Sequence, residues 1–567
     1  MLTFSDEPNV AEQQMHAVLF FMVTFGYIDG DFDAAEKDYV KKQIKSLVEQ
    51  RVDGAMPDAD PPLRAELVGK YTTHFREVFE GIDRHVRDLL TEPVADGEEQ
   101  AGFVRNKLKT RCFEILQSFN EASREELMAA IDELIMADGS AHPAELEFRA
   151  EMAALLEEDL GIELEDDGSA SSATRLESPS TMPSDGENHP FFNAFEYHYA
   201  KETDKILKQV AADRALLDRV IATLDEQRAK GRGKLAGKKL VAELAGSDPF
   251  LDGHTYVLPP KPGRAYDLTV LGDLHGCYSV LKAAIMQSKF FDKVNAFRDD
   301  PEHAPEPKLI LLGDYIDRGM FSLNGVLRTV MQLFVTAPEF VHVLRGNHEY
   351  YIEHEGKIYG GVRPAESINT LKPYLSMDVF RHYMKLFDAL PNTLLFDKIL
   401  FVHGGIARDR LLKERWKDLS SLNDKDIRFQ MMWSDPSSAD VIPADLQDKS
   451  NRFAFGRLQL RAFLQRIGCH TLIRGHEKVN AGIESVYEGD AARECSLITL
   501  FSAGGSDNDD LPKDSSYRTV KPMALTIKRS AKGEMTFTPW APDYKAYNDP
   551  AKNAFFKVPP EIAHKAD

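Results

Sequence analysis

Clusters of Asp, His, Asn and Arg recur in this chain directly after short apolar runs that stop at glycine. The first three are Gly272-Asp273-Leu274-His275-Gly276, Gly313-Asp314-Tyr315-Ile316-Asp317-Arg318-Gly319 and Arg345-Gly346-Asn347-His348-Glu349. Carboxylate and amide oxygens mixed with imidazole, and without thiolate, suit manganese, iron or zinc better than a structural zinc site. The pattern predicts two divalent metal ions and the hydrolysis of a phosphoester.

Strands must hold these clusters in place, because the carboxyl ends of parallel strands gather polar loops at one edge of a sheet. Apolar runs that alternate with helical stretches indicate an α/β layered domain. We expect strands at 268–271, 309–312, 341–344, 399–402, 470–473, 497–501 and 523–527, with a candidate edge strand at 534–537.

Two later clusters complete a recognisable series. They are His403-Gly404-Gly405 and Arg474-Gly475-His476, and between them lie Trp433-Ser434-Asp435-Pro436 and Asn451-Arg452-Phe453. In this order the motifs resemble the PPP-type serine/threonine protein phosphatases of the calcineurin-like metallophosphoesterase superfamily. The resemblance implies an α/β fold (an α+β sandwich) over 258–545, with a double β-sheet core flanked by helices. It also implies that a metal-bridging hydroxide removes phosphate from phosphoserine and phosphothreonine in proteins.

The resemblance assigns a role to each motif residue. One metal ion is expected on Asp273, His275 and Asp314, and the other on Asp314, Asn347, His403 and His476. His348 would protonate the leaving oxygen, since a carboxylate partner, Asp317, keeps a histidine protonated near neutral pH. Arg318, Asn347 and Arg452 would bind the substrate phosphate, and guanidinium forks match its oxygens. Manganese is the expected metal, with iron and zinc as alternatives, and Asp435 is expected close behind the site.

One departure from the family pattern leaves the substrate open. The family sequence SAPNY, whose Tyr overhangs the cleft, is replaced by Ser502-Ala503-Gly504-Gly505-Ser506-Asp507-Asn508-Asp509-Asp510. We expect a flexible acidic loop there. An insert over 350–368 could also reshape the cleft.

The first part of the chain, 1–164, has apolar residues at helical spacing. An Asp-Gly turn followed by Glu occurs twice, as Asp29-Gly30 with Glu36 and as Asp138-Gly139 with Glu145. These turns resemble the helical domain of TerB-type tellurite-resistance proteins. The four acidic residues could bind a divalent cation, or they could simply cap helices.

The remaining segments connect these parts. We expect a flexible linker over 165–190, which is rich in Ser, Asp and Gly. A helical connector is expected over 191–257 and a C-terminal tail over 546–567.

Composition limits the possible partners. A formal charge of −22 over 567 residues argues against nucleic acid and anionic membranes as partners. Four distant cysteines without a CxxC pair, and no apolar run long enough to cross a bilayer, predict a cytoplasmic protein. The expected partners are a phosphoprotein substrate and, at the helical domain, a protein or a divalent cation.

Two other functions fit the same residues. A dinucleoside-polyphosphate or other small-molecule phosphoesterase would use the same chemistry. A regulatory adaptor with a phosphatase output would instead use the helical domain to recruit a partner.

Overall fold

The computed structural model describes residues 8–28, 32–57, 60–89, 100–119, 121–137, 142–157, 174–184, 188–200, 202–367, 377–487 and 495–557. The chain divides into two compact units. The helical unit comprises Met1–Gly161 and Ser437–Gly456, and the α/β unit comprises Ile162–Pro436 and Arg457–Asp567. The α/β architecture and the helical region before it are as the sequence predicted.

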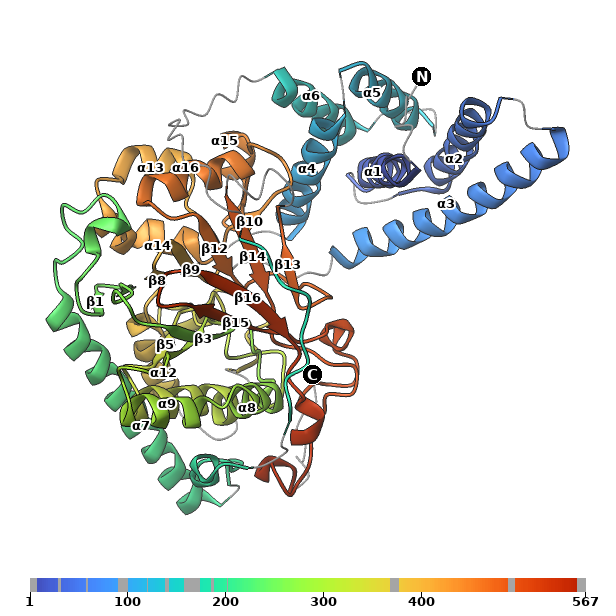
Figure 1. Ribbon diagram of the computed structural model, residues 1–567. Coiled ribbons are helices and arrows are strands. Elements are labelled where there is room, and N and C mark those ends of the chain that lie inside the picture. Colours follow the sequence, from blue (N-terminus) through green and yellow to red (C-terminus); the bar gives the residue numbers. More distant parts are fainter. Residues whose placement is uncertain are drawn as a thin grey trace. The chain divides into compact units, whose positions relative to one another are not determined.

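The helical unit is built from amphipathic helices that bury their apolar sides against one another. They are α1 (Pro8–Gly26), α2 (Ala34–Ala55), α3 (Pro61–Leu89), α4 (Gln100–Ser118), α5 (Glu121–Ile135) and α6 (Pro143–Glu157), drawn in blue to cyan in Figure 1. Their core is rich in large apolar side chains, with Phe21, Phe113 and Ile131 fully buried.

A distant segment of the chain completes this core. Ala439, Ile442 and Leu446, from the 437–456 segment, belong to the same buried cluster as the helices. The segment is also held by hydrogen bonds, because Asn106 donates to the Leu446 carbonyl and Ser437 donates to Glu114. It contains the short helix α15 (Ala444–Gln447). The expected continuous domain over 258–545 is therefore interrupted by 20 residues that fold with the helical unit.

The two Glu residues of the internal repeat cap helices. The side chain of Glu36 accepts the Asp33 backbone N–H at 2.9 Å, while Asp33 accepts the Glu36 N–H at 2.8 Å. Glu145 accepts the His142 backbone N–H at 2.9 Å in the second copy. This is the capping-box arrangement. The other two expected cation ligands, Asp29 and Asp138, lie outside the described residues, so the TerB-like reading stays a prediction.

Two sheets form the framework of the α/β unit. One has seven strands in the order β1-β2-β8-β9-β12-β14-β13, and the other has five in the order β16-β15-β3-β4-β5. The first contains β1 (Phe250–Asp252), β2 (Thr255–Leu258), β8 (Thr393–Phe396), β9 (Ile399–Val402), β12 (Thr471–Arg474), β14 (Ser496–Leu500) and β13 (Ile483–Ser485). The second contains β16 (Met535–Trp540), β15 (Ala524–Arg529), β3 (Tyr266–Leu271), β4 (Glu306–Leu311) and β5 (Val341–Val343). Side chains of both sheets share one apolar core.

Parallel pairing brings the motif loops together. In the five-stranded sheet β3, β4 and β5 are parallel neighbours, and in the seven-stranded sheet β9, β12 and β14 are parallel neighbours. Residues 272–276, 313–319 and 345–349 therefore leave three adjacent strand ends. The backbone of Asp273 also pairs with that of Phe501 just beyond β14, which joins the ends of the two sheets.

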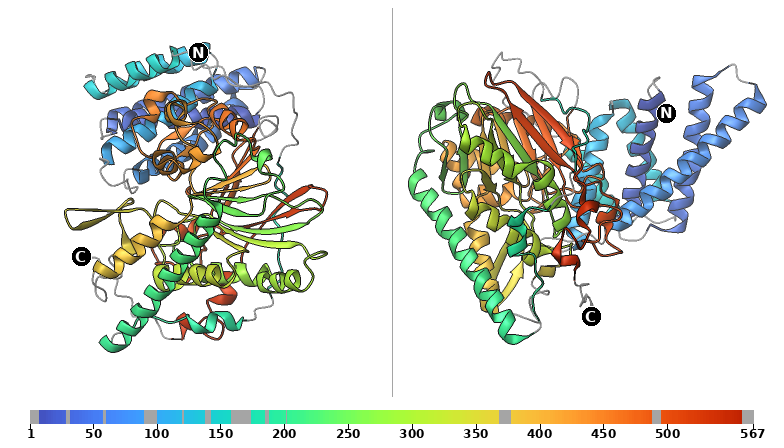
Figure 2. Two further views of the ribbon diagram at one scale, coloured as in Figure 1. Left: turned by 90° about the vertical axis from the view of Figure 1, so that its left-hand side faces the viewer. Right: turned by 60° about the horizontal axis from the view of Figure 1, so that its bottom comes forward.

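Helices flank the sheets, as Figure 1 shows. They include α8 (Tyr278–Gln287), α9 (Phe290–Asp299), α10 (Arg328–Thr336), α12 (Met377–Ala389), α13 (Asp409–Arg415), α14 (Lys425–Met431) and α16 (Arg457–Ile467). The long helix α7 (Thr203–Gly231) packs on α10, α12 and β1, and Figure 2 shows it in green along the outside of the α/β unit. The expected connector over 191–257 is thus a built-in part of this unit, and its last residues form β1 and β2 rather than helix.

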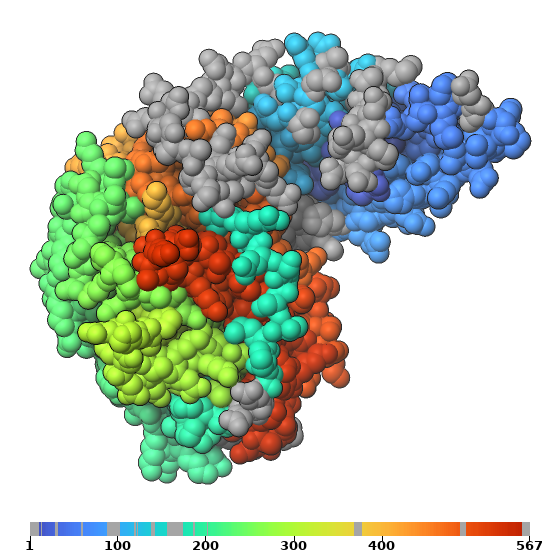
Figure 3. All heavy atoms as spheres, in the orientation of Figure 1, coloured from blue at the N-terminus to red at the C-terminus, as the bar shows by residue number. Residues whose placement is uncertain are grey.

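Part of the expected linker has a fixed place. Residues 174–184 run beside β16, where the Glu177 and Ser180 N–H groups donate to the Phe537 and Pro539 carbonyls, each at 2.9 Å. Figure 3 shows this teal segment next to the red C-terminal residues on one face. The segment covers a sheet edge that would otherwise expose unpaired backbone groups. The rest of 165–190 is outside the described residues except 188–190.

Part of the expected tail is also packed. Phe555 is fully buried in the core of the α/β unit, with its ring 4.7 Å from that of Phe321. The last ten residues of the chain are not described. None of the helices in the described residues combines the length and the hydropathy needed to cross a membrane.

Candidate active site and metal centre

The strand ends of the α/β unit gather nine of the predicted site residues. Asp273 and His275 follow β3; Asp314, Asp317 and Arg318 follow β4; Asn347 and His348 follow β5; His403 follows β9 and His476 follows β12. Apart from Arg318, each of these side chains is buried. Carboxylates and imidazoles this deeply buried are costly unless each is paired or binds a cation.

The backbone in these loops is held in an uncommon conformation. Positive φ angles occur at His275 (40°), Asp314 (52°), Asp317 (67°), Arg318 (66°) and His476 (73°). Side chains other than glycine rarely adopt this region, and such residues concentrate at functional sites. Backbone strain at these five residues supports a functional role for the loops.

Glycines beside the ligands leave room for them. A Cβ on Gly346 would lie 2.1 Å from Asp314 Oδ1, and one on Gly475 would lie 2.3 Å from Asp273 Oδ1. The RGN and RGH motifs therefore need glycine because a carboxylate occupies the space where a side chain would stand.

Backbone carbonyls fix the tautomers of three histidines. His275 and His403 donate from Nδ1 to the Ile316 and Leu312 carbonyls, at 2.9 and 3.0 Å, and His476 donates from Nε2 to the Trp433 carbonyl at 3.2 Å. The remaining nitrogen of each ring then carries a lone pair. Second-shell hydrogen bonds of this kind orient metal-binding histidines.

The lone pairs of His275 and His403 face carboxylates. His275 Nε2 lies 3.7 Å from Asp273 Oδ2 and 3.6 Å from Asp314 Oδ2. On the other side of Asp314, His403 Nε2 lies 3.4 Å from its Oδ1. The two oxygens of one carboxylate thus face two separate groups of ligands, which is the arrangement expected of a bridging ligand.

Asn347 joins the second group. Its side-chain oxygen lies 2.9 Å from His403 Nε2 and 3.2 Å from His476 Nδ1. Turned over, the amide nitrogen would donate to these same atoms and to Asp314. An oxygen facing two nitrogen lone pairs is repulsive, and either the turned amide or a cation between these atoms removes the repulsion. With the oxygen inward, the amide and the two imidazoles form a donor set that fits a divalent ion.

Electrostatics favour cations in both groups. Burial raises the pKa of Asp273 to about 7, and the charge of Asp314 adds to the shift. Burial lowers the pKa of His275 and of His403. Within the described residues, Asp273 Oδ2 is buried and accepts no hydrogen bond. A divalent cation beside these groups would stabilise the ionised carboxylates and neutral imidazoles that ligation requires.

The predicted acid–base pair is formed. His348 Nδ1 lies 2.7 Å from Asp317 Oδ2, and His348 Nε2 lies 3.9 Å from Asp314 Oδ2. The His348 ring packs edge-on at 4.6 Å against that of His275. Asp317 thus orients the imidazole, whose other nitrogen faces the predicted metal ligands.

The 350–368 insert reaches this pair. Ser367 donates its backbone N–H to Asp317 Oδ1 at 2.8 Å and accepts the Asp317 N–H at 3.1 Å. Glu366 accepts the backbone N–H of Arg318. The insert contains a hairpin of β6 (Tyr351–His354) and β7 (Lys357–Gly360). Its last residues hold Asp317 and Arg318 in place.

Other predicted residues are placed differently. Asp435 accepts a hydrogen bond from Arg474 at 2.8 Å and lies 3.7 Å from His476 Nε2, so it supports a predicted ligand as expected. Arg452 belongs to the helical unit, where its N–H donates to Ser450 at 3.1 Å. The role of Arg452 in phosphate binding stays a prediction.

Glu349 is a site residue that sequence reasoning missed. It is fully buried and accepts the backbone N–H groups of Asp314, Tyr315 and Gly346 at 2.9, 2.8 and 3.0 Å. Burial raises its pKa to about 8. This carboxylate ties two ligand loops together, and its position directly after Asn347-His348 was the available signal.

Tyr517 is a second missed residue, and it lies shortly after the 502–510 stretch that was expected to be flexible. Its ring is 5.3 Å from that of His275, and its hydroxyl pairs with the guanidinium of Arg318. The loop is anchored by buried Asp510, which accepts the Ser279 backbone N–H at 2.5 Å and its hydroxyl at 3.0 Å. The loop after β14 is thus anchored, and it returns a tyrosine to His275 from 41 residues beyond His476.

Part of the chain matches known phosphoesterases in sequence. The family described as calcineurin-like phosphoesterase matches residues 266–480. A probable serine/threonine-protein phosphatase of Encephalitozoon cuniculi is 25% identical over 262 residues, which cover 46% of this chain and 51% of that protein. The chain therefore spans about half the length of this curated relative.

Solved structures also show partial likeness. A protein serine/threonine phosphatase of Saccharomyces cerevisiae is 20% identical, with a TM-score of 0.33, over 49% of this chain and 84% of its own. A cold-active protein-tyrosine phosphatase of a psychrophilic Shewanella is 17% identical, with a TM-score of 0.29, over 50% of this chain and 82% of its own.

Proposed function

We propose that the chain, whose residues 266–480 match the calcineurin-like phosphoesterase family, is a serine/threonine protein phosphatase that depends on two divalent metal ions. One observation carries the proposal. Two groups of inward-facing ligands share Asp314, and the His348–Asp317 pair lies beside them.

The geometry supports the proposed ligand roles. Asp273, His275 and Asp314 would hold one ion, and Asp314, Asn347, His403 and His476 would hold the other. When bound, the two ions would activate water as the nucleophile and neutralise charge on the phosphoryl group. Manganese fits the mixture of oxygen and imidazole ligands, and iron or zinc would fit it as well.

The chain's own residues would do the rest. His348 would give a proton from Nε2 to the leaving oxygen, and Asp317 would hold its Nδ1–H toward the carboxylate. Arg318 would bind phosphate oxygens through its guanidinium, with Asn347 and Arg452 as further substrate ligands. Tyr517 would keep the Arg318 guanidinium in position.

The test uses the full chain loaded with manganese. We expect hydrolysis of phosphoserine and phosphothreonine peptides and of nitrophenyl phosphate, with slower release from a phosphotyrosine peptide of matched sequence. A protein that binds two metal equivalents and leaves all of these substrates intact would contradict the proposal.

A second candidate acts on small molecules. The loop after β14 departs from the SAPNY pattern, and this departure supports a dinucleoside polyphosphate as an alternative substrate. Rates on diadenosine tetraphosphate and on the phosphothreonine peptide, measured side by side, discriminate the two. A kcat/KM that favours the dinucleotide would select the alternative.

A further inference from the structure

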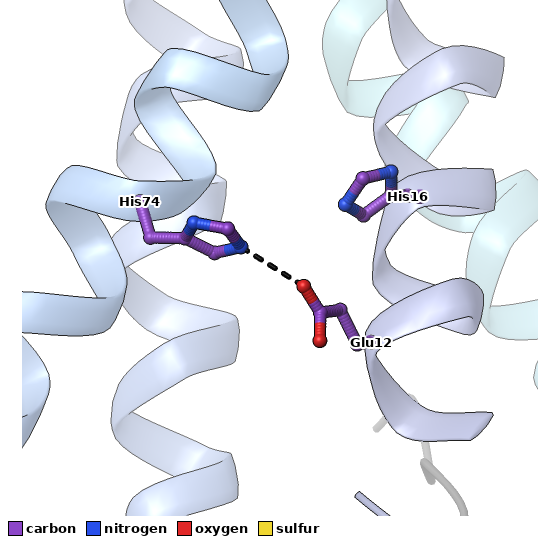
Figure 4. A group of neighbouring side chains, drawn as sticks. All are labelled: Glu12, His16 and His74. Atoms are coloured by element: carbon purple, nitrogen blue, oxygen red, sulfur yellow. Dashed lines mark hydrogen bonds and ion pairs between the residues drawn. The ribbon is translucent and has the colours of Figure 1, made fainter. Parts of the chain in front are cut away.

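A group of potential metal ligands lies in the helical unit, apart from the candidate active site. Glu12 and His16 extend from α1, and His74 extends from α3 (Figure 4). One ligand atom from each side chain lies within 4.8 Å of the other two. We propose that this group is a binding site for a transition-metal ion of the zinc type.

Helix geometry puts the three side chains together. Glu12 and His16 are four residues apart on α1, so they share one face of that helix. α3 packs against α1, and His74 Nε2 lies 3.0 Å from Glu12 Oε1. Phe75 packs edge-on against both imidazoles, with ring centroids 6.2 Å from His16 and 4.9 Å from His74.

The ligand types select the kind of ion. Two imidazoles and one carboxylate are the protein ligands of open tetrahedral zinc sites, in which water takes the fourth position. Such a set also accepts copper, nickel or cobalt, and it disfavours calcium and magnesium, which require oxygen ligands. The site is therefore different in chemistry from the acidic cation site predicted from Asp29, Glu36, Asp138 and Glu145.

The spacing suits closure around an ion. Ligand atoms bound tetrahedrally at about 2.1 Å from zinc lie roughly 3.4 Å apart. The Glu12–His74 pair is already at 3.0 Å, so mainly His16 has to approach. All three side chains are exposed, and small rotations of exposed side chains are inexpensive.

A bound ion would join α1 to α3. These helices are separated in sequence by α2, so the ion would link distant parts of the helical unit. Because the ion would bind the folded unit and not the unfolded chain, stability would rise with zinc concentration. The helical unit would then respond to zinc independently of any phosphatase chemistry.

The experiment counts bound zinc in the full chain. The Asp314→Asn variant serves as the background, since it weakens the candidate active site and leaves the helical unit unchanged. We expect Asp314→Asn proteins that also carry His16→Ala or His74→Ala to bind one zinc equivalent fewer than Asp314→Asn alone. Adding His303→Ala, which removes an exposed histidine of the α/β unit, should leave the zinc content unchanged.

A second readout does not depend on total metal content. Zinc should raise the melting temperature of the Asp314→Asn protein, and the rise should vanish in the Glu12→Gln variant, which keeps a similar shape without the charge. Equal zinc content in the His74→Ala and His303→Ala proteins would overturn the proposal. An unchanged zinc-dependent rise in Glu12→Gln would overturn it as well. Neither readout measures hydrolysis, so failure here leaves the proposed phosphatase function untouched.

Discussion

At the scale of single residues, the distinctive feature is a carboxylate shared by two ligand groups. Asp314 Oδ2 faces His275 and Asp314 Oδ1 faces His403, while Asp273 takes part in only one group. Losing a bridging ligand should therefore release more metal than losing a terminal ligand.

We predict that Asp314→Asn loses both manganese equivalents, whereas Asp273→Asn loses one. An amide carries no charge and binds hard cations more weakly than a carboxylate does. Metal analysis after dialysis measures the difference, with Asp509→Asn, at an exposed residue, as the control. Equal metal loss in the two ligand variants would show that Asp314 is not shared.

The acid–base pair gives a separate prediction. His348→Ala should lower kcat on phosphopeptides by at least ~10²-fold, because the leaving oxygen loses its proton donor. Metal content should stay at the wild-type value, since His348 is assigned no ligand role. Asp317→Asn should lower kcat in the same direction by disturbing the imidazole. A His348→Ala protein with lost metal and restored activity at high manganese would instead assign His348 as a ligand.

At the scale of elements, the loop after β14 is the part that was predicted least well. Acidic and glycine-rich residues predicted flexibility. The structure instead anchors the loop through Asp510 and the helix α8, and the 3-10 turn Ser516–Thr519 presents Tyr517. Burial raises the pKa of the Tyr517 phenol, so it is neutral when it accepts from Arg318.

Tyr517→Phe should raise KM for phosphopeptides by roughly 10-fold, because Arg318 loses a hydrogen bond worth about 1.5 kcal/mol. The kcat value should change little. Steady-state kinetics check this, with Tyr544→Phe from the same neighbourhood as the control. Equal KM values in the Tyr517→Phe and wild-type proteins would place Tyr517 outside the substrate path.

The anchor itself makes stability depend on pH. Burial raises the pKa of Asp510 from 3.8 to about 7. Between these values the unfolded chain has released the proton that the folded protein still holds, so stability falls as pH rises toward 7. Asp510→Asn removes this loss. Relative to wild type, the variant should gain on the order of 2 kcal/mol between pH 5 and pH 8.

Denaturant unfolding at the two pH values measures this gain. The Asp509→Asn variant, one residue earlier and exposed, should show no comparable pH-dependent difference from wild type. If the free energies of unfolding of Asp510→Asn and wild type differed by the same amount at both pH values, Asp510 would not be the source of the pH dependence.

At the scale of the whole molecule, the two units are not consecutive in sequence. The helical unit requires the 437–456 segment, whose Ile442 and Leu446 are 1% and 3% exposed. Each such side chain contributes about 1.5–3 kcal/mol when buried. A domain boundary at residue 258 would therefore separate the first helices from the 437–456 segment that completes their core.

We predict that a chain starting at Ile162 aggregates, because removing the helices exposes Ile442 and Leu446. Changing both residues to Ser should improve the solubility of this shortened chain. In the full chain the same double change should lower the melting temperature of the helical unit, since it then removes core packing. Light scattering measures the solubility of the shortened chain, and thermal unfolding measures the melting temperature of the full chain. A double change that raised both quantities, or lowered both, would contradict the shared core.

The sequence by itself located the candidate site. Motif residues and their order predicted the metal ligands, the acid–base pair and the strands before them, because ligation and strand ends demand particular side chains next to glycine. Helices in the first part followed from the apolar spacing. These features depend on residues close together in sequence, so short sequence patterns are enough to predict them.

Only the tertiary structure decided how distant segments are used. The folding of 437–456 with the helices, the return of Tyr517 to His275, the edge cover by 174–184 and the grouping of His74 with Glu12 all depend on which surfaces meet. Such contacts depend on packing between residues far apart in sequence, and no short spacing encodes them. The acidic loop looked flexible for the same reason, since the Ser279 groups that anchor Asp510 lie more than 200 residues away.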